Sequence, residues 1–281
     1  MTSQPNSRRR KAEPYQPSDA ELKAAADLVT RLTPSPDAYK EYRLLADFYM
    51  DAVGPVVRRQ QAGVLKGLRM WGSMLFAGQE YLIGHVADEW LAGVAPTCDA
   101  ICSTMTEPQD QLAEGMQLPP LVFVPVSKRR ARSSAFVSVV EHEIVHLNQA
   151  ILGTCPVPPA GRGAEDLLEF FVTLAGAEYE ASFVQLARWP ETFPADSGVS
   201  LHHWCLVRGY SQALEHALLL SMQLDFPAHA CQGFLESLES HLPDLLRRIG
   251  ASEDVIPWFL ERLTTHVYLA ISNALSHMPA A

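Results

Sequence analysis

Three residues near the middle of the chain have the types and spacing of a metal site. His142 and His146 are four residues apart, and Glu143 directly follows the first histidine. On a helix, residues i and i+4 lie on one face, so two imidazoles placed there can bind one metal ion. A carboxylate beside that metal can take a proton from a water molecule. The spacing therefore predicts one Zn²⁺ ion on His142 and His146, with Glu143 as the general base of a hydrolase.

A zinc ion in a catalytic site needs a third protein ligand, and the helix expected over residues 165–188 offers several carboxylates. At about 100° per residue, Glu165, Glu169 and Glu180 fall opposite the apolar face of this helix. Glu178 falls near the middle of the apolar face. A carboxylate that points into a core is costly unless it is paired, protonated or bound to a metal. We therefore predict that Glu178 is the third ligand.

The motif and the segment around Glu178 together resemble the gluzincin branch of zinc metallopeptidases. Glu178-Tyr179-Glu180-Ala181 looks like the E-[YF]-x-A segment of CAAX-processing and HtpX-type peptidases. It is also similar to the E-x-E-A segment of ImmA/IrrE-like peptidases. The resemblance covers residues 121–183, and Ser182 stands where the CAAX-type enzymes have Asp.

This resemblance implies a zincin-like fold and a metallopeptidase that acts on a peptide or protein. Zinc would be bound by His142, His146 and Glu178, and Glu143 would act on the water. Glu165 is the alternative third ligand, because its distance from His146 resembles that in thermolysin-like enzymes. Its context is Gly-Ala-Glu-Asp in place of their Asn-Glu, so spacing alone supports it.

An oxyanion stabiliser is expected near the metal, and the sequence does not choose among several side chains of suitable type. Gln149, one turn past His146, is expected either to orient that ligand or to cap the helix end. The candidates for the oxyanion are Tyr179, His202, His203 and Tyr210.

Two other functions are compatible with the motif. Glu143-x-x-His146 is also a ligand pair of di-iron carboxylate oxidases and oxygenases built on helical bundles, although the chain has no second Glu-x-x-His. The third hypothesis is a catalytically inactive zincin-fold module with a regulatory role. The residues that would complete a di-iron site are Glu80, Glu89, Glu141, Glu178 and His216.

The rest of the chain predicts a mainly α fold with a small edge strand or minimal sheet beside the motif helix. Leu121–Val126 is the strand candidate, and Pro125 would confine it to a sheet edge or end it. Ser18 and Glu21 form a capping box, and Ser133 or Ser134 caps the motif helix. The expected helices are 18–32, 37–53, 56–76, 79–91, 133–152, 165–188, 201–224, 233–249 and 254–276, with Trp71, Leu75, Leu82, Val86 and Trp90 in the core.

Composition sets broader limits on the function. The 281 residues are 48% hydrophobic and carry a formal net charge of −10, which argues against a nucleic-acid or anionic-membrane binder. No run is apolar for the length of a membrane span. The five cysteines follow no disulfide pattern, so we expect reduced thiols and a cytoplasmic location. We expect a disordered basic tail over residues 1–17 and one domain over residues 18–281, with the metal site within 121–188. Neither the substrate nor the oligomeric state can be predicted.

Overall fold

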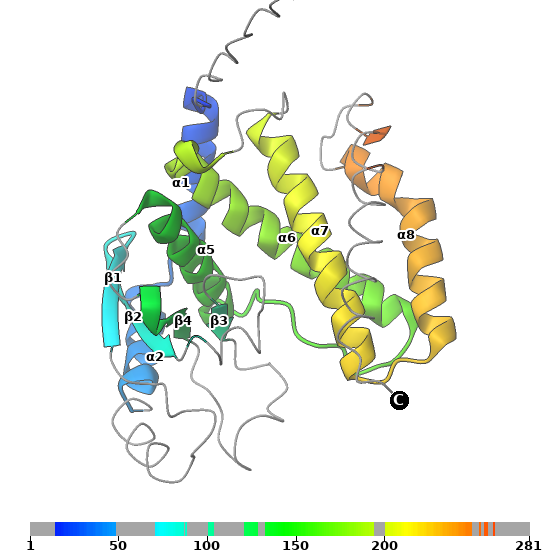
Figure 1. The fold of residues 1–281 in the computed structure, drawn as a ribbon, viewed down its shortest axis with the longest axis horizontal. Coiled ribbons are helices and arrows are strands. Elements are labelled where there is room, and N and C mark those ends of the chain that lie inside the picture. The colour runs from blue at the N-terminus through cyan, green and yellow to red at the C-terminus, as the bar shows by residue number, and fades with distance from the viewer. Residues whose placement is uncertain are drawn as a thin grey trace, which may run out of the picture.

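The structure is a computed structural model that describes residues 15–48, 71–86, 101–103, 121–128, 133–193 and 200–248, together with residues 88, 253, 256, 257 and 261. Helices dominate these residues and one small sheet lies beside them (Figure 1), so the predicted mainly α fold is confirmed. The longer elements are α1 (Asp19–Leu32), α2 (Pro36–Phe48), β1 (Trp71–Phe76), β2 (Gln79–Val86), β3 (Ile101–Ser103), β4 (Leu121–Pro125), α5 (Ser134–Ile151), α6 (Ala164–Arg188), α7 (Leu201–Gln223) and α8 (Ala228–Arg248).

The four strands form one sheet in the order β1-β2-β4-β3. β1 and β2 are an antiparallel hairpin, and Ala77 and Gly78 between them both have positive φ, 49° and 80°. Positive φ at both central residues is the turn geometry that matches the twist of paired strands. The helices predicted over 56–76 and 79–91 are therefore wrong where these ranges meet β1 and β2. Leu75, predicted as core, lies on β1 and is 70% exposed.

The strand predicted over Leu121–Val126 is present as β4 and ends at Pro125, one of the two outcomes predicted for this proline, whereas the alternative place at a sheet edge is wrong. β4 pairs with β2 in parallel and with β3 in antiparallel orientation, so both of its sides are covered. All five residues of β4 are buried. Pro125 is the last residue of the strand, where it lies beyond the stretch that pairs with β3.

The helix boundaries follow local signals that the sequence contains. The Ser18–Glu21 capping box begins α1, and Ser133 Oγ accepts a hydrogen bond from the backbone at the start of α5. Gly153, with a φ of 69°, follows the end of α5. α6 and α7 agree with the predicted ranges within one residue, whereas α8 begins earlier than residue 233. The helix predicted over 254–276 falls almost entirely outside the described residues, as does most of the tail over 1–17.

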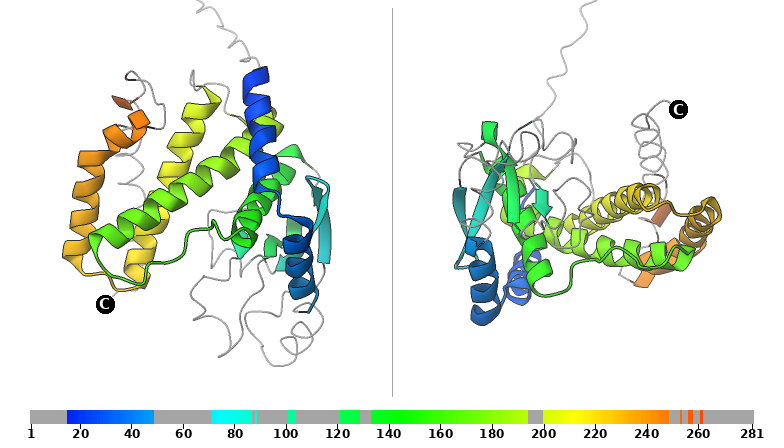
Figure 2. Two further views of the ribbon diagram at one scale, coloured as in Figure 1. Left: turned by 180° about the vertical axis from the view of Figure 1, so that it is seen from behind. Right: turned by 90° about the horizontal axis from the view of Figure 1, so that it is seen from below.

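α6 joins two separate hydrophobic cores. Its C-terminal part, including Phe183 and Leu186, packs with the sheet, α1, α2 and α5. Its N-terminal part, including Leu167 and Phe171, packs with α7 and α8. Figure 2 shows α6 crossing the molecule from the α1 side to the α8 side. Glu178 lies on α6 at the junction of the two cores, since buried Ala175 belongs to one of them and buried Ala181 to the other.

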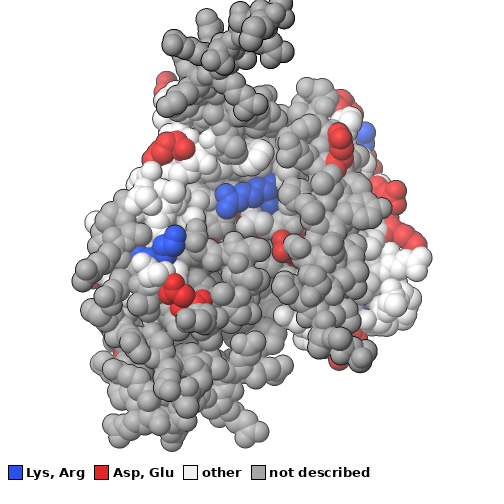
Figure 3. Space-filling model, viewed as in Figure 1, with Lys and Arg blue, Asp and Glu red and all other residues white. Residues whose placement is uncertain are grey.

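The surface of the described residues reflects the acidic composition of the chain. In Figure 3, acidic side chains lie along the edge of the molecule at α8. This helix exposes Glu236, Glu239 and Asp244. Within the described residues, no helix combines the length and the apolar character needed to cross a membrane.

Candidate metal centre

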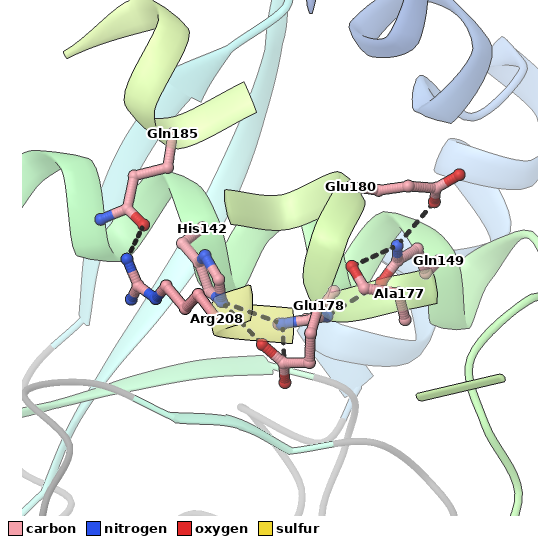
Figure 4. A network of polar contacts seen from close by, with 8 residues as sticks. His142, Gln149, Ala177, Glu178, Glu180, Gln185 and Arg208 are labelled. Carbon is pink, nitrogen blue, oxygen red and sulfur yellow. Dashed lines mark hydrogen bonds and ion pairs between the residues drawn. The ribbon is translucent and has the colours of Figure 1, made fainter. Parts of the chain in front are cut away.

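The predicted ligands lie where α5 and α6 cross. Gln149 Nε2 donates to the carbonyl of Ala177 at one end of the contact, and Gln185 Nε2 donates to Ser138 Oγ at the other. The two helices therefore run in opposite directions across each other. His142, a neighbour of the crossing point on α5, faces Glu178 on α6 (Figure 4).

The ligand atoms of His142, His146 and Glu178 converge on one point, and we call these three residues the triad. The two Nε2 atoms are 3.1 Å apart, Glu178 Oε2 lies 3.4 Å from His142 Nε2, and Glu178 Oε1 lies 3.5 Å from His146 Nε2. Ligands at zinc distances in a tetrahedral arrangement are roughly 3.3–3.4 Å apart. The triad therefore has the donor types and the spacing that fit one zinc ion.

Burial and charge also set the triad apart from an ordinary surface cluster. The side chains of His142, His146 and Glu178 are 5%, 12% and 7% exposed. Burial lowers the pKa of His142 to about 4. Burial acts in the same direction on His146, but the Glu178 carboxylate outweighs it and raises the pKa of His146 to about 9. Burial opposes ionisation of Glu178, yet the two imidazoles hold the pKa of its carboxyl well below its usual range. One positive charge between the imidazoles thus stabilises the carboxylate, and a divalent cation would supply the same stabilisation.

Unsatisfied atoms in the triad support the same interpretation. Glu178 Oε2 is buried and has no hydrogen-bond partner among the described residues. A buried carboxylate oxygen without a donor costs free energy unless a cation compensates it. His142 Nδ1 is also buried without a hydrogen-bond partner within the described part of the chain, but it lies on the far side of the ring from Nε2, so a metal in the triad would not satisfy it.

Gln149 orients His146 from the side away from the triad. Its Oε1 lies 2.8 Å from His146 Nδ1, and its Nε2 donates to Glu180 Oε2 at 2.9 Å. Glu180 in turn pairs with Arg31 on α1 at 2.7 Å. With its Nε2 donating to two oxygens, Gln149 presents Oε1 as the acceptor for a proton on His146 Nδ1. When a metal ion takes the place of the Nε2 proton, the Nε2 lone pair of His146 is then directed into the triad.

Gln149→Leu is expected to lower zinc affinity by roughly 10- to 100-fold, because His146 loses the group that fixes its ring and tautomer. Competition with a chromophoric chelator would measure the affinity. Gln232→Leu, an exposed glutamine of α8 that bonds Glu236, is the matched control and should bind zinc as the wild type does. Equal affinity for a folded Gln149→Leu protein would remove Gln149 from the site.

Glu141 is engaged away from the triad, which separates it from Glu143 on the same helix. Its buried carboxylate accepts hydrogen bonds from Arg188 Nε at 2.7 Å, Arg188 Nη2 at 3.0 Å and Trp189 Nε1 at 2.7 Å. Of the other residues considered for a di-iron site, Glu80 and His216 are exposed. Glu89 lies outside the described residues. The described residues thus bring one of those five, Glu178, to the histidines.

Two further predicted residues, Glu165 and Tyr179, lie on α6 with Glu178. Glu165 is exposed in the first turn of α6 and is not part of the His142 cluster. Tyr179 follows Glu178, and its hydroxyl is 2.9 Å from His202 Nδ1 on α7.

His203 and Tyr210, the other two candidates for the oxyanion, contact residues outside the triad. His203 Nδ1 lies 3.0 Å from Ser200 Oγ at the start of α7. Tyr210 packs against Phe171 in the second core, and burial raises the pKa of Tyr210 to about 12. Neither contact brings these side chains to the triad.

Arg208 on α7 is a residue near the triad that the sequence reading did not single out. Figure 4 shows it beside the His142 ring, and its charge contributes to lowering the pKa of His142. Its Nη1 donates to Gln185 Oε1 at 3.2 Å. The signal available in the sequence is that Arg208 is the one Arg or Lys of α7, set between apolar and small residues.

A surface groove of about 970 Å³ lies between α1 and the end of α6. Its lining includes Leu22, Val29 and Trp189, and none of the triad residues. The groove adjoins the Glu141 ion pair, so we do not assign it to the metal centre.

Comparison of the chain with protein-family models, with curated proteins and with solved structures gives no match.

Proposed function

We propose that the protein is a zinc-dependent hydrolase, and specifically a metallopeptidase that uses one zinc ion. The observation that carries this proposal is the convergence of His142, His146 and Glu178, whose ligand atoms all lie within 4.8 Å of one another. Two imidazoles and one carboxylate are the protein ligands of a major class of catalytic zinc sites. A fourth position is then left for water or substrate.

Glu143 is the proposed general base. A zinc ion in such a site lowers the pKa of water and polarises a carbonyl group. Glu143 directly follows His142 on α5, is half-buried, and lies close enough for its charge to act on His146. Its carboxylate would take a proton from the attacking water and pass it to the leaving amine.

A peptide bond is the proposed target for two reasons. The E-Y-x-A segment that begins at Glu178 resembles that of metallopeptidases, and Glu178 is the residue of this segment that faces the histidines. The chemistry of Glu143 also suits a poor leaving group, since an amine must be protonated as it departs.

Metal analysis and metal removal test the proposal. Purified protein should contain one zinc per chain and hydrolyse some members of a peptide library. A chelator should abolish hydrolysis, and added zinc should restore it. Two irons per chain would support a di-iron enzyme instead, and full activity in the metal-free protein would exclude the proposed chemistry.

A further inference from the structure

The packing of α7 against α6 brings Arg208 to the metal centre. Gly209 makes this contact close, because a Cβ atom there would lie 2.9 Å from both the Ala175 carbonyl oxygen and the Tyr179 backbone nitrogen. Tyr179 is the neighbour of the ligand Glu178. Arg208, the residue before Gly209, therefore lies close to the triad, and Figure 4 shows it beside His142.

The Arg208 guanidinium is held by buried polar groups. Gln185 Oε1 accepts from Arg208 Nη1 at 3.2 Å, and Gln185 Nε2 donates to Ser138 Oγ at 3.2 Å. Both Gln185 and Ser138 are buried. A chain of side chains from α6 and α5 thus fixes the direction of a half-buried cation on α7.

Within the described residues, Arg208 has no ion-pair partner, since no carboxylate lies within 4 Å of its guanidinium. The Arg208 guanidinium has five N–H donors, and the hydrogen bond to Gln185 uses one of them. A half-buried cation beside a site for a divalent cation is costly unless an anion compensates it. The fork of donors on a guanidinium matches a carboxylate.

The same face of α7 carries two further polar side chains with unsatisfied atoms. Ser211 and Gln212 follow Arg208 by three and four residues, so they share its face of the helix. Ser211 Oγ and Gln212 Oε1 are buried atoms that have no hydrogen-bond partner among the described residues. Polar atoms in this state lack the hydrogen bonds that usually compensate burial.

We propose that Arg208 forms a carboxylate-binding subsite beside the metal centre, so that the substrate carries a carboxylate close to the bond that is hydrolysed. This inference rests on the proposed function and names its substrate class. Figure 4 shows the guanidinium on the side of His142 away from Glu178. That position suits a substrate group next to the reacting carbonyl better than the carbonyl oxygen itself.

Ligand binding tests the subsite without relying on activity. Calorimetry would compare an N-acetylated amino acid, which has a free carboxylate, with its amide on zinc-loaded protein. Arg208→Met should weaken binding of the carboxylate by roughly 10- to 100-fold and leave binding of the amide unchanged. Arg162→Met is the control, because Arg162 is an exposed arginine of the loop before α6. Arg208→Lys keeps the charge and loses the forked pair of donors, so its affinity for the carboxylate should lie between that of Arg208→Met and that of the wild type. Arg208→Lys is the deciding variant if Arg208→Met does not fold.

Kinetics identify the source of the carboxylate. Acetylated peptides with a free C-terminus, the same peptides amidated, and amidated peptides containing Asp or Glu would be compared. In Arg208→Met, KM should rise for the peptides with the recognised carboxylate while kcat changes little. Faster cleavage of free C-termini would assign the α-carboxylate, and faster cleavage of the amidated acidic peptides would assign a side chain.

Two results would overturn the subsite. Arg208→Met could weaken carboxylate and amide equally, or it could lower kcat alike on every peptide, which would give Arg208 a role at the carbonyl oxygen. Failure of the proposed function gives a different result: zinc-loaded wild-type protein hydrolyses nothing, while calorimetry still decides whether Arg208 binds a carboxylate.

Discussion

Glu143→Gln protein is expected to keep its zinc and to lose roughly 10²- to 10⁴-fold in the rate of peptide hydrolysis. The amide keeps the size of the side chain but cannot accept the proton of the attacking water. The three ligands are unchanged, so metal content should equal that of the wild type. Single-turnover rates and metal analysis on the same preparation would measure both quantities.

Glu169→Gln is the matched control for this experiment, since Glu169 is an exposed carboxylate on α6. It should retain full activity and full metal content. A Glu143→Gln protein with zinc and undiminished biological activity would instead favour a regulatory module that binds metal without using it for catalysis.

Glu178→Ala is expected to lose zinc during purification. The substitution removes a ligand outright, so the loss of affinity should exceed the roughly 10- to 100-fold expected when an orienting group such as Gln149 is removed. Equilibrium dialysis against zinc would measure it. Circular dichroism would confirm that the helices persist, because the Glu178 side chain pairs with two histidine side chains and the substitution leaves the α6 backbone in place.

Glu165→Ala is the control that separates the two candidate third ligands. Glu165 is exposed and lies outside the triad, so this protein should bind zinc normally. Release of zinc by Glu165→Ala together with full retention by Glu178→Ala would show that the assignment of the third ligand is wrong.

The helices around the triad could be predicted because their signals are local. Ser133 at the start of α5 and Gly153 after its end act within one turn of the chain. Glu178 could be predicted because helical phase places it among apolar residues, and it is buried in the structure. These features depend on short-range geometry, which a sequence contains directly.

The sheet could not be predicted correctly because its signals are not local. Gly78 is a residue type that favours such a turn, but Ala77 also has a positive φ, a conformation in which alanine is uncommon, so the residue pair did not indicate the hairpin turn between β1 and β2. β4 is interior because β2 and β3, distant in the sequence, pair with its two sides. A local pattern of apolar residues cannot specify such neighbours.

Arg208 illustrates the same limit within the candidate site. Its position beside His142 depends on the close contact that Gly209 allows between α7 and α6. The ion pair of Glu141 with Arg188 also joins residues far apart in the chain. The placement of His142 and His146 on one face of α5 could be predicted from spacing, whereas the groups that surround them required the packing of three helices.

A series of polar contacts runs from His146 through Gln149 and Glu180 to Arg31 at the surface of the molecule. Gln149 is buried, Glu180 has a 22% exposed side chain, and Arg31 has a 64% exposed one. Dissolved salt screens an exposed ion pair strongly and a buried hydrogen bond weakly. An increase in ionic strength should therefore loosen Arg31 from Glu180 while Gln149 continues to hold His146. The orientation of the His146 ring should therefore change little with ionic strength, because the buried Gln149 lies between His146 and the exposed ion pair.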